Sequence, residues 1–285
     1  MRFPWQKKQA DPVIPHAEQT TACRIYTLSE TGPVRTGNED NLVFFYPDKH
    51  TCAVFAMVAD GMGGHQAGEV ASAIACDTAK EFVGLHYKKM KPPALLSKLV
   101  QEIHQRIHDA AAKDPALNGM GTTAVMALIA DQQLHFAHVG DSRLYYYNKI
   151  KTVQLTTDHT LVNQLVDEGT ITAAAAIGHP QKNVLLQALG TVAAVKPEVS
   201  REPVSLSLGE RCFLCSDGVY DAVTPQEIGH LLQMTDPAFA LDALRALCMQ
   251  RRAQDNFTAI IIDIATYRPE AVTREQTVMY EPTIE

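Results

Sequence analysis

The chain has 285 residues, of which 46% are hydrophobic and 20% are charged, and its net charge is −7. These values are ordinary for a globular protein that buries a sizeable core. The acidic balance argues against a nucleic-acid surface, because such a surface needs a basic patch and the densest basic cluster is only Lys88, Lys89 and Lys91. No apolar run approaches the length that spans a bilayer. We therefore expect a monomeric, cytoplasmic protein that binds neither nucleic acid nor membrane.

Apolar alternation predicts many strands, several of which follow one another closely, as antiparallel hairpins do. In chain order the expected strands are 23–29, 41–46, 51–59, 122–130, 133–139, 143–148, 152–155, 196–203, 211–215 and 257–264. Helical spacing of apolar residues marks 67–87, 93–112, 225–232 and 238–252. Because strands and helices come in blocks, the pattern favours an α+β fold, a layered sandwich of antiparallel sheets covered by helices, over a Rossmann-type fold.

The ends of the chain differ from its body. Residues 1–20 and 267–285 carry several prolines among polar residues and lack amphipathic periodicity, which predicts flexible tails. The body, 21–266, shows no repeat or linker and is predicted to be one domain. Its cysteines are scattered without disulfide-rich density or zinc-site spacing. Cys212 and Cys215 form a C-x-x-C, but an offset of three on a strand sends them to opposite faces, so we interpret both as reduced core residues.

Four aspartates lie where predicted strands end or begin: Asp60, Asp141 and Asp217 follow apolar runs, and Asp255 precedes the last one. Aspartate and glycine are turn residues, so any one of these Asp-Gly pairs is equally well a simple turn. Gathered at one rim without cations, the carboxylates would repel one another by roughly 3–4 kcal/mol per close pair at an effective dielectric of about 20. Oxygen ligands without histidine or cysteine favour Mg²⁺ or Mn²⁺ over zinc.

An ordered set of seven motifs resembles the bacterial branch of the type 2C (PPM) metal-dependent serine/threonine protein phosphatases. The resemblance covers nearly the whole body and implies an α-β-β-α sandwich of two antiparallel sheets flanked by helices, with a two-metal site at one end of the sheets. It also implies phosphorylated protein substrates and a cognate serine/threonine kinase. The motifs are Arg35-Thr-Gly-Asn-Glu-Asp40, Val58-Ala-Asp-Gly-Met-Gly-Gly-His65, Gly121-Thr-Thr123, Val139-Gly-Asp-Ser-Arg143, Asp158-His159, Leu214-Cys-Ser-Asp-Gly218 and Asp255-Asn256.

The resemblance implies metal ligands position by position. Asp60 would bridge two Mn²⁺ or Mg²⁺ ions, with the carbonyl of Gly61 on one ion and Asp217 and Asp255 on the other. The implied reaction is hydrolysis of a phosphoserine or phosphothreonine ester by a water or hydroxide between the two metals, attacking in line and without a covalent enzyme intermediate.

Three further acidic residues support this site. Glu39 and Asp40 resemble residues that hold metal-bound waters, where carboxylates orient ligands. Asp141 resembles the residue that forms a third metal position together with Asp217. The alternative for Asp141 is a turn aspartate that bonds to its own backbone.

Two arginines near the acidic residues receive different roles. The planar guanidinium of Arg35 suits bidentate binding of a phosphate, so we assign Arg35 to the substrate. A salt bridge from Arg35 to Glu39 or Asp40 is the structural alternative, and the two uses need not exclude each other. We interpret Arg143 as part of an architectural ion pair.

The leaving alkoxide needs a proton, and its source does not follow from the acidic residues. Eukaryotic relatives carry a histidine directly after the Asp-Gly, where this chain has Met62, and methionine cannot donate a proton. His65 matches the histidine of the bacterial pattern and would supply the proton or contact the substrate. Solvent is the competing proton source.

Residues 158–190 resemble the family's flap, which we expect to select substrates because a peptide must lie across it. Its middle, 173–178, carries no charge, so no charge-based preference is expected. Asp158 and His159 at its end would instead brace the site. Two other functions remain beside the enzyme: a catalytically silent phosphoprotein-binding regulatory module, which predicts broken metal ligands, and a two-metal phosphodiesterase, which favours a basic channel or stacking aromatics.

Overall fold

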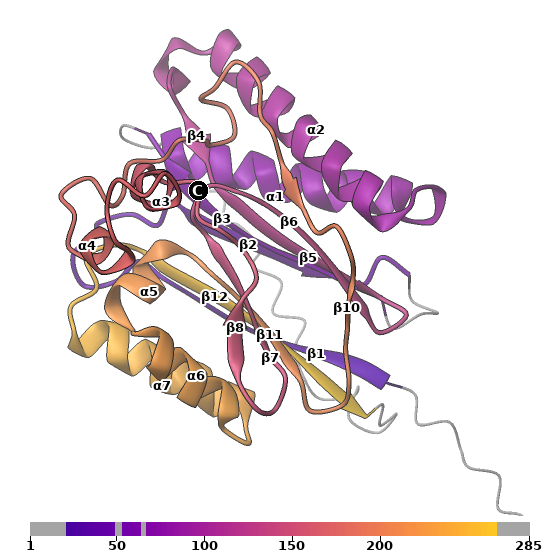
Figure 1. The fold of residues 1–285 in the computed structure, drawn as a ribbon. Coiled ribbons are helices and arrows are strands. Elements are labelled where there is room, and N and C mark those ends of the chain that lie inside the picture. Colours follow the sequence, from indigo (N-terminus) through magenta and orange to yellow (C-terminus); the bar gives the residue numbers. More distant parts are fainter. Residues whose placement is uncertain (1–20, 49–52, 64–66, 267–285) are drawn as a thin grey trace, which may run out of the picture.

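The computed structural model describes residues 21–48, 53–63 and 67–266. They form four layers, in which two antiparallel sheets lie face to face and helices cover the outer face of each sheet (Figure 1). The predicted α+β sandwich is confirmed. The predicted tails, 1–20 and 267–285, lie outside the described residues.

The first sheet places the first and the last described strand, β1 and β12, side by side. β1 and β12 pair along their whole length, and every neighbouring pair in this sheet is antiparallel. The order of its strands is β1 (Thr21–Glu30), β12 (Phe257–Thr266), β11 (Arg211–Cys215), β7 (Arg143–Tyr147) and β8 (Thr152–Gln154).

The second sheet is built around the hairpin of β5 and β6. Its main path is β10 (Val204–Ser205), β6 (Gln133–Val139), β5 (Ala124–Ala130), β3 (Val54–Met62) and β2 (Asp40–Phe45). Two short strands lie off this path, β4 (Gly121–Thr122) beside β3 and β9 (Glu198–Val199) beside β6.

Two groups of helices cover the sheets. Long helices α1 (Ala67–His86) and α2 (Pro92–Lys113) cover the second sheet, and α5 (Asp217–Ala222), α6 (Pro225–Gln233) and α7 (Pro237–Gln250) cover the first. Short α3 (Leu161–Asp167) and α4 (Ala173–Ile177) lie in the segment after β8, and two 3-10 turns are η1 (Tyr87–Lys89) and η2 (Pro115–Leu117). None of the helices in the described part of the chain is both long and apolar enough to cross a membrane.

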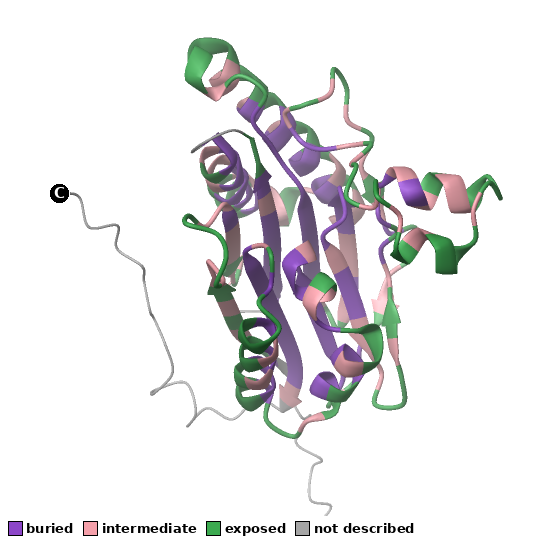
Figure 2. Cartoon of the chain, turned by 90° about the vertical axis from the view of Figure 1, so that its left-hand side faces the viewer, coloured by how far each residue is buried: buried purple, intermediate pink, exposed green. Residues whose placement is uncertain are grey.

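Successive side chains of a strand point to opposite faces of its sheet, so each strand packs against two layers at once. On β12, Phe257, Ala259 and Ile261 pack among the helices, whereas Ile260 and Ile262 pack between the sheets. The buried residues therefore fill the sheets and the inner faces of the helices, as Figure 2 shows. The prediction for the C-x-x-C is confirmed in the same way, because its first cysteine packs between the sheets, its second packs against the helices, and both are free thiols.

The predicted strand 196–203 is wrong. Only Glu198–Val199 pairs there, with β6, and a separate pairing follows at Val204–Ser205. Pro197 and Pro203 lie at the edges of these short pieces, and proline has no N–H to donate to a strand ladder. A second difference concerns the residues after β11, where the sequence predicted a turn and the structure has helix α5.

Candidate functional site

The acidic residues named from the sequence meet at one edge of the two sheets. Asp40 opens β2 and lies directly opposite Asp60 of β3. Asp141 follows β6, which runs parallel to β3 across β5, and so leaves the second sheet at the same edge. In the first sheet Asp217 opens α5 directly after β11, and Asp255 precedes the antiparallel β12. Five acidic residues from different parts of the sequence therefore converge at this edge.

The carboxylates at this edge raise one another's pKa. Burial raises the pKa of Asp60 well above its ordinary value, and the charges of Asp40, Asp217 and Asp141 raise it further. The pKa of Asp217 is raised well above its ordinary value by burial first, and then by Asp141 and Asp255. Burial also raises the pKa of Asp40 and that of Asp141 to about 6. Such mutual repulsion in a desolvated site calls for positive charge.

A cation would also satisfy an unpaired oxygen. The Oδ1 atom of Asp217 is buried and has no hydrogen-bond partner among the described residues. An unsatisfied buried acceptor costs roughly 1–3 kcal/mol, and more when it is charged. The donors gathered here are carboxylate oxygens, which are the ligands that Mg²⁺ and Mn²⁺ prefer. The side chains present therefore fit the divalent ions that the sequence predicted.

Gly61 lies where the start of α1 approaches β3. A Cβ atom at Gly61 would stand 2.2 Å from the carbonyl oxygen of Gly68 and 2.5 Å from that of Glu39. The N–H of Gly61 donates to this Glu39 carbonyl over 3.1 Å. Burial raises the pKa of the Glu39 carboxyl, against the opposing effect of Arg35. The absence of a side chain at Gly61 thus lets Glu39 lie beside the acidic edge.

Arg35 has a different partner from the one the sequence predicted. Its Nη2 atom lies 2.6 Å from Asp255 Oδ2, and its Nε donates to the carbonyl of Gln254 over 3.3 Å. The predicted alternative, a salt bridge to Glu39 or Asp40, is wrong as to partner. Glu39 and Asp40 were expected as partners because they are close to Arg35 in sequence. The observed contact instead joins the turn before β2 to the turn before β12. Arg35 nevertheless lies at the rim of the acidic cluster.

Hydroxyl groups hold the acidic turns in place. Thr123 accepts from the N–H of Asp60 over 3.1 Å and shares a hydrogen bond of 2.7 Å with Ser142. Ser216 donates to Asp40 over 2.6 Å and accepts from the N–H of Thr258 over 3.0 Å. These bonds cross between neighbouring turns, so they fix the distances between the carboxylates.

Asn256 joins three chain segments that carry the site. Its Oδ1 accepts from the N–H of Glu39 over 2.9 Å. Its amide nitrogen donates to the carbonyls of Thr31 and Gly37, each over 2.9 Å. The sequence motif contained Asn256 but did not assign it this role, because the bonds connect residues more than 200 positions apart.

Asp141 interacts with a residue that sequence reasoning missed. Interactions with Tyr220 and with its own backbone lower the pKa of the Asp141 carboxyl, against the larger effect of burial. The guanidinium of Arg143 lies 3.5 Å from the centre of the Tyr220 ring and donates to both oxygens of Asp158 over 2.6–3.0 Å. The architectural ion pair of Arg143 is confirmed. Tyr220 lies three residues after Asp217 on α5, and residues three apart on a helix share a face. A correct prediction of α5 would therefore have placed Tyr220 near the site.

The predicted proton donor is His65. His65 lies outside the described residues, which end at Gly63 on this side of the gap and resume at Ala67. Met62, which precedes the gap, is the last residue of β3 and is 37% exposed. The assignment of His65 stays a prediction.

Comparison with known proteins agrees with this geometry. The family model for protein phosphatase 2C matches residues 35–251. The serine/threonine phosphatase stp of Listeria innocua is 36% identical over 244 residues, which are 82% of this chain and 93% of that protein. The serine/threonine protein phosphatase PstP of Mycobacterium tuberculosis is 35% identical over 255 residues, which are 88% of this chain and 47% of that protein.

A solved structure extends the likeness to three dimensions. The crystal structure of the catalytic domain of PstP in complex with two manganese ions has a TM-score of 0.75 to this chain at 31% identity, covering 86% of this chain and all of that one. The chain thus spans nearly the whole length of the Listeria relative and about half of the mycobacterial one. It belongs to the protein phosphatase 2C family, and it is a serine/threonine protein phosphatase of the bacterial branch of that family.

Proposed function

We propose that this phosphatase hydrolyses phosphoserine and phosphothreonine esters with two Mn²⁺ or Mg²⁺ ions held where Asp60, Asp217 and Asp255 meet. The observation that carries the proposal is the buried, unpaired Oδ1 of Asp217 within a cluster whose members raise one another's pKa. The two manganese ions in the PstP catalytic-domain structure support the same stoichiometry.

The metal ligands are assigned as the sequence predicted them. Asp60 would contact both ions, the Gly61 carbonyl one of them, and Asp217 and Asp255 the other. When bound, the ions would lower the pKa of an attacking water and neutralise charge on the phosphoryl oxygens.

The outer acidic residues complete the site. Glu39 and Asp40 would orient waters around the ions, and the 2.6 Å bond from Ser216 fixes the direction of the Asp40 carboxylate. Asp141 is assigned with Asp217 to a third metal position. Tyr220 of α5 supports that assignment because it acts on the Asp141 carboxyl and lowers its pKa, which favours the charged form that binds a cation.

Arg35 is assigned to the substrate phosphate. Its side chain is 47% exposed, so a phosphate can reach it without unfolding the turn. The bond to Asp255 orients the planar fork toward the acidic rim, and a forked donor suits two phosphoryl oxygens at once. The leaving alkoxide would take its proton from His65 or from solvent.

We infer that a serine/threonine kinase supplies the phosphorylated protein substrates, since the reaction consumes the product of such a kinase. We also infer that the protein works in the cytoplasm. The free thiols of the described cysteines support a reducing compartment. A monomeric state is a prediction that light scattering coupled to size-exclusion chromatography tests.

The proposed function is tested by phosphate release from a phosphothreonine peptide with Mn²⁺, with Mg²⁺ and with EDTA. We expect metal-dependent release that Asp217→Asn abolishes. Asp242→Asn, on the exposed face of α7, is the matched control and should behave as the native chain does. A folded, metal-loaded native chain that releases no phosphate would contradict the proposal and favour the silent regulatory module.

A further inference from the structure

A pair of backbone and side-chain hydrogen bonds ties His159, near the start of the 158–190 segment, to Gly140. The N–H of His159 donates to the Gly140 carbonyl over 3.0 Å. In return, the N–H of Gly140 donates to Nδ1 of His159 over 3.2 Å. Gly140 directly precedes Asp141, has a φ of +97°, and could not carry a Cβ, which would lie 2.6 Å from Thr123. His159 therefore closes the turn that presents Asp141.

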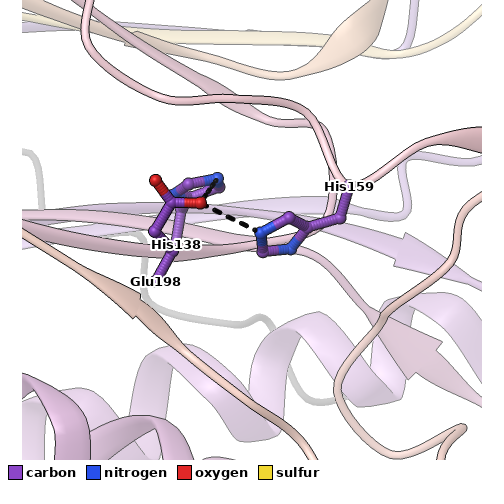
Figure 3. Close-up of side chains that lie close together, drawn as sticks. All are labelled: His138, His159 and Glu198. Atoms are coloured by element: carbon purple, nitrogen blue, oxygen red, sulfur yellow. Dashed lines mark ion pairs between the residues drawn. The ribbon is translucent and has the colours of Figure 1, made fainter. Parts of the chain in front are cut away.

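These contacts fix which nitrogen of His159 carries the proton. A backbone N–H can only donate, so Nδ1 must offer a lone pair, and the proton of the neutral ring must lie on Nε2. Figure 3 shows Glu198 beside this nitrogen, with its Oε2 at 3.5 Å from His159 Nε2. Pairing of β9 with β6 sets Glu198 opposite His138, and this holds the carboxylate near the ring. Glu198 thus favours the tautomer that the Gly140 bond requires.

His138, His159 and Glu198 have the composition of a zinc site, and their ligand atoms lie close together. Their hydrogen bonds argue against that use. The Nε2 atom of His138 lies 2.8 Å from the carbonyl oxygen of Thr157, which only accepts, so this nitrogen also carries a proton. The facing nitrogens of both rings are then protonated, whereas a metal needs the lone pair of a neutral imidazole. The stacked rings, 4.6 Å apart, serve as packing.

We propose that His159 is a positioning residue for Asp141, and that Glu198 orients His159. The inference rests on the proposed place of Asp141 in the metal centre. His159 holds the backbone that carries Asp141, whereas Tyr220 acts on the Asp141 side chain by lowering its pKa. Partners that orient a metal ligand typically matter roughly 10–100-fold in metal affinity or activity.

Glu198 has the smaller share of this effect. It lines a surface cavity of about 600 Å³, together with His159, Phe136, Lys196 and Arg201. Its side chain is 49% exposed there, whereas that of His159 is 12% exposed. Water in the cavity screens the carboxylate, so loss of its charge weakens the preference for one tautomer but leaves the bond to Gly140 in place.

The test compares His159→Asn with His159→Leu. Asparagine keeps an oxygen near the Nδ1 position that can accept from Gly140, whereas leucine keeps the size and removes the acceptor. His108, on the exposed face of α2 and outside this segment, supplies the control. Calorimetric titration with Mn²⁺ measures binding, and hydrolysis of a phosphothreonine peptide gives kcat and KM at several Mn²⁺ concentrations.

We expect His159→Leu to weaken the weakest Mn²⁺ site and to lower kcat by roughly tenfold or more, with the peptide KM unchanged. His159→Asn and His108→Leu should stay close to the native chain, and Glu198→Gln should lie between. If the leucine variant does not melt cooperatively, His159→Gln decides, because glutamine reaches toward Glu198 but offers no acceptor near Gly140, and it should show the same loss.

Three results would overturn the inference. A folded His159→Leu with native Mn²⁺ binding and kcat would rule out the positioning role. An equal loss of Mn²⁺ affinity and kcat in His159→Asn and His159→Leu would show that His159 contributes packing alone. Zinc bound by the native chain and lost in His138→Asn would overturn the tautomer assignment. A native chain that binds Mn²⁺ but releases no phosphate would instead count against the proposed function, and the Mn²⁺ titrations would still test His159.

Discussion

The guanidinium of Arg35 lies 2.6 Å from a carboxylate oxygen of Asp255, 220 residues further along the chain. The two side chains are 47% and 35% exposed, so the pair lies at the mouth of the acidic cluster. Asp255 is also an assigned metal ligand. Once Asp255 binds a metal ion, its carboxylate would attract the guanidinium less strongly. The planar fork of Arg35 would then be available for a phosphate. We therefore predict that recognition of the phosphate is coupled to loading of the metal site.

Substitution of Arg35 should weaken catalysis through substrate binding. We expect Arg35→Ala to lower kcat/KM by about 100-fold, mostly through KM, since a charged bidentate contact contributes roughly 3 kcal/mol. Arg35→Lys should recover only part, because an ammonium lacks the planar fork. Arg245→Ala is the control, as Arg245 is similarly exposed and paired with Glu30. Equal kinetics for the two alanine variants would contradict the assignment.

The acidic cluster should reverse the pH dependence of stability when metal is removed. Asp40 and Asp141 have pKa values of about 6 in the folded chain and an ordinary value of 3.8. Between these values the folded state binds more protons than the unfolded state, so these groups make the free energy of unfolding fall as pH rises from about 4 to about 6. With Mn²⁺ the trend should reverse, because ligands must lose their protons.

Thermal unfolding between pH 4 and pH 8, in EDTA and in Mn²⁺, measures this effect. Asp60→Asn serves as the comparison, since it removes a carboxyl whose own raised pKa contributes to the fall in EDTA, and the fall should therefore flatten. Identical slopes for the native chain and Asp60→Asn in EDTA would show that the cluster does not set the pH dependence.

Much of the fold was readable from local periodicity. The strands at Gln133–Val139 and Arg211–Cys215 begin and end where alternation of apolar residues predicted. Asp60, Asp141 and Asp217 were identified because turn residues follow apolar runs, and because the motifs resemble a known family. Their convergence follows from topology, since strands that run the same way end at the same edge of a sheet.

The contacts between distant turns were not readable. Neither the partner of Arg35 nor the three bonds of Asn256 has a local signature, because each depends on which loops meet in the folded chain. Tyr220 was missed since the six-residue helix α5 is too short for helical periodicity to show. The strand predicted over 196–203 failed because alternation alone did not weigh the prolines that interrupt pairing.

Tyr220→Phe should weaken metal binding without unfolding the chain. Burial raises the pKa of Tyr220, so its hydroxyl stays protonated and can donate to Asp141. Phenylalanine keeps the ring under Arg143 and loses only this donor. We expect Mn²⁺ to bind the weakest site roughly tenfold less tightly, with an unchanged melting temperature. Tyr145→Phe removes a hydroxyl that accepts from Arg143 over 3.2 Å but does not touch Asp141, and a similar loss there would contradict this role.

Two glycines, one in β3 and one near the end of α1, should respond in opposite directions to alanine. At Gly61 the new Cβ would meet backbone oxygens at 2.2 Å and 2.5 Å, which cannot move without shifting α1 or the turn of Glu39. We expect Gly61→Ala to destabilise the chain by about 2 kcal/mol or more and to abolish phosphate release. Gly84, on α1, has nothing within 4 Å of an added Cβ, so Gly84→Ala should stabilise by about 0.5–1 kcal/mol with unchanged activity. Chemical denaturation with parallel phosphate-release assays measures both, and a stable, active Gly61→Ala would show that the close approach of α1 is not needed to form the metal edge.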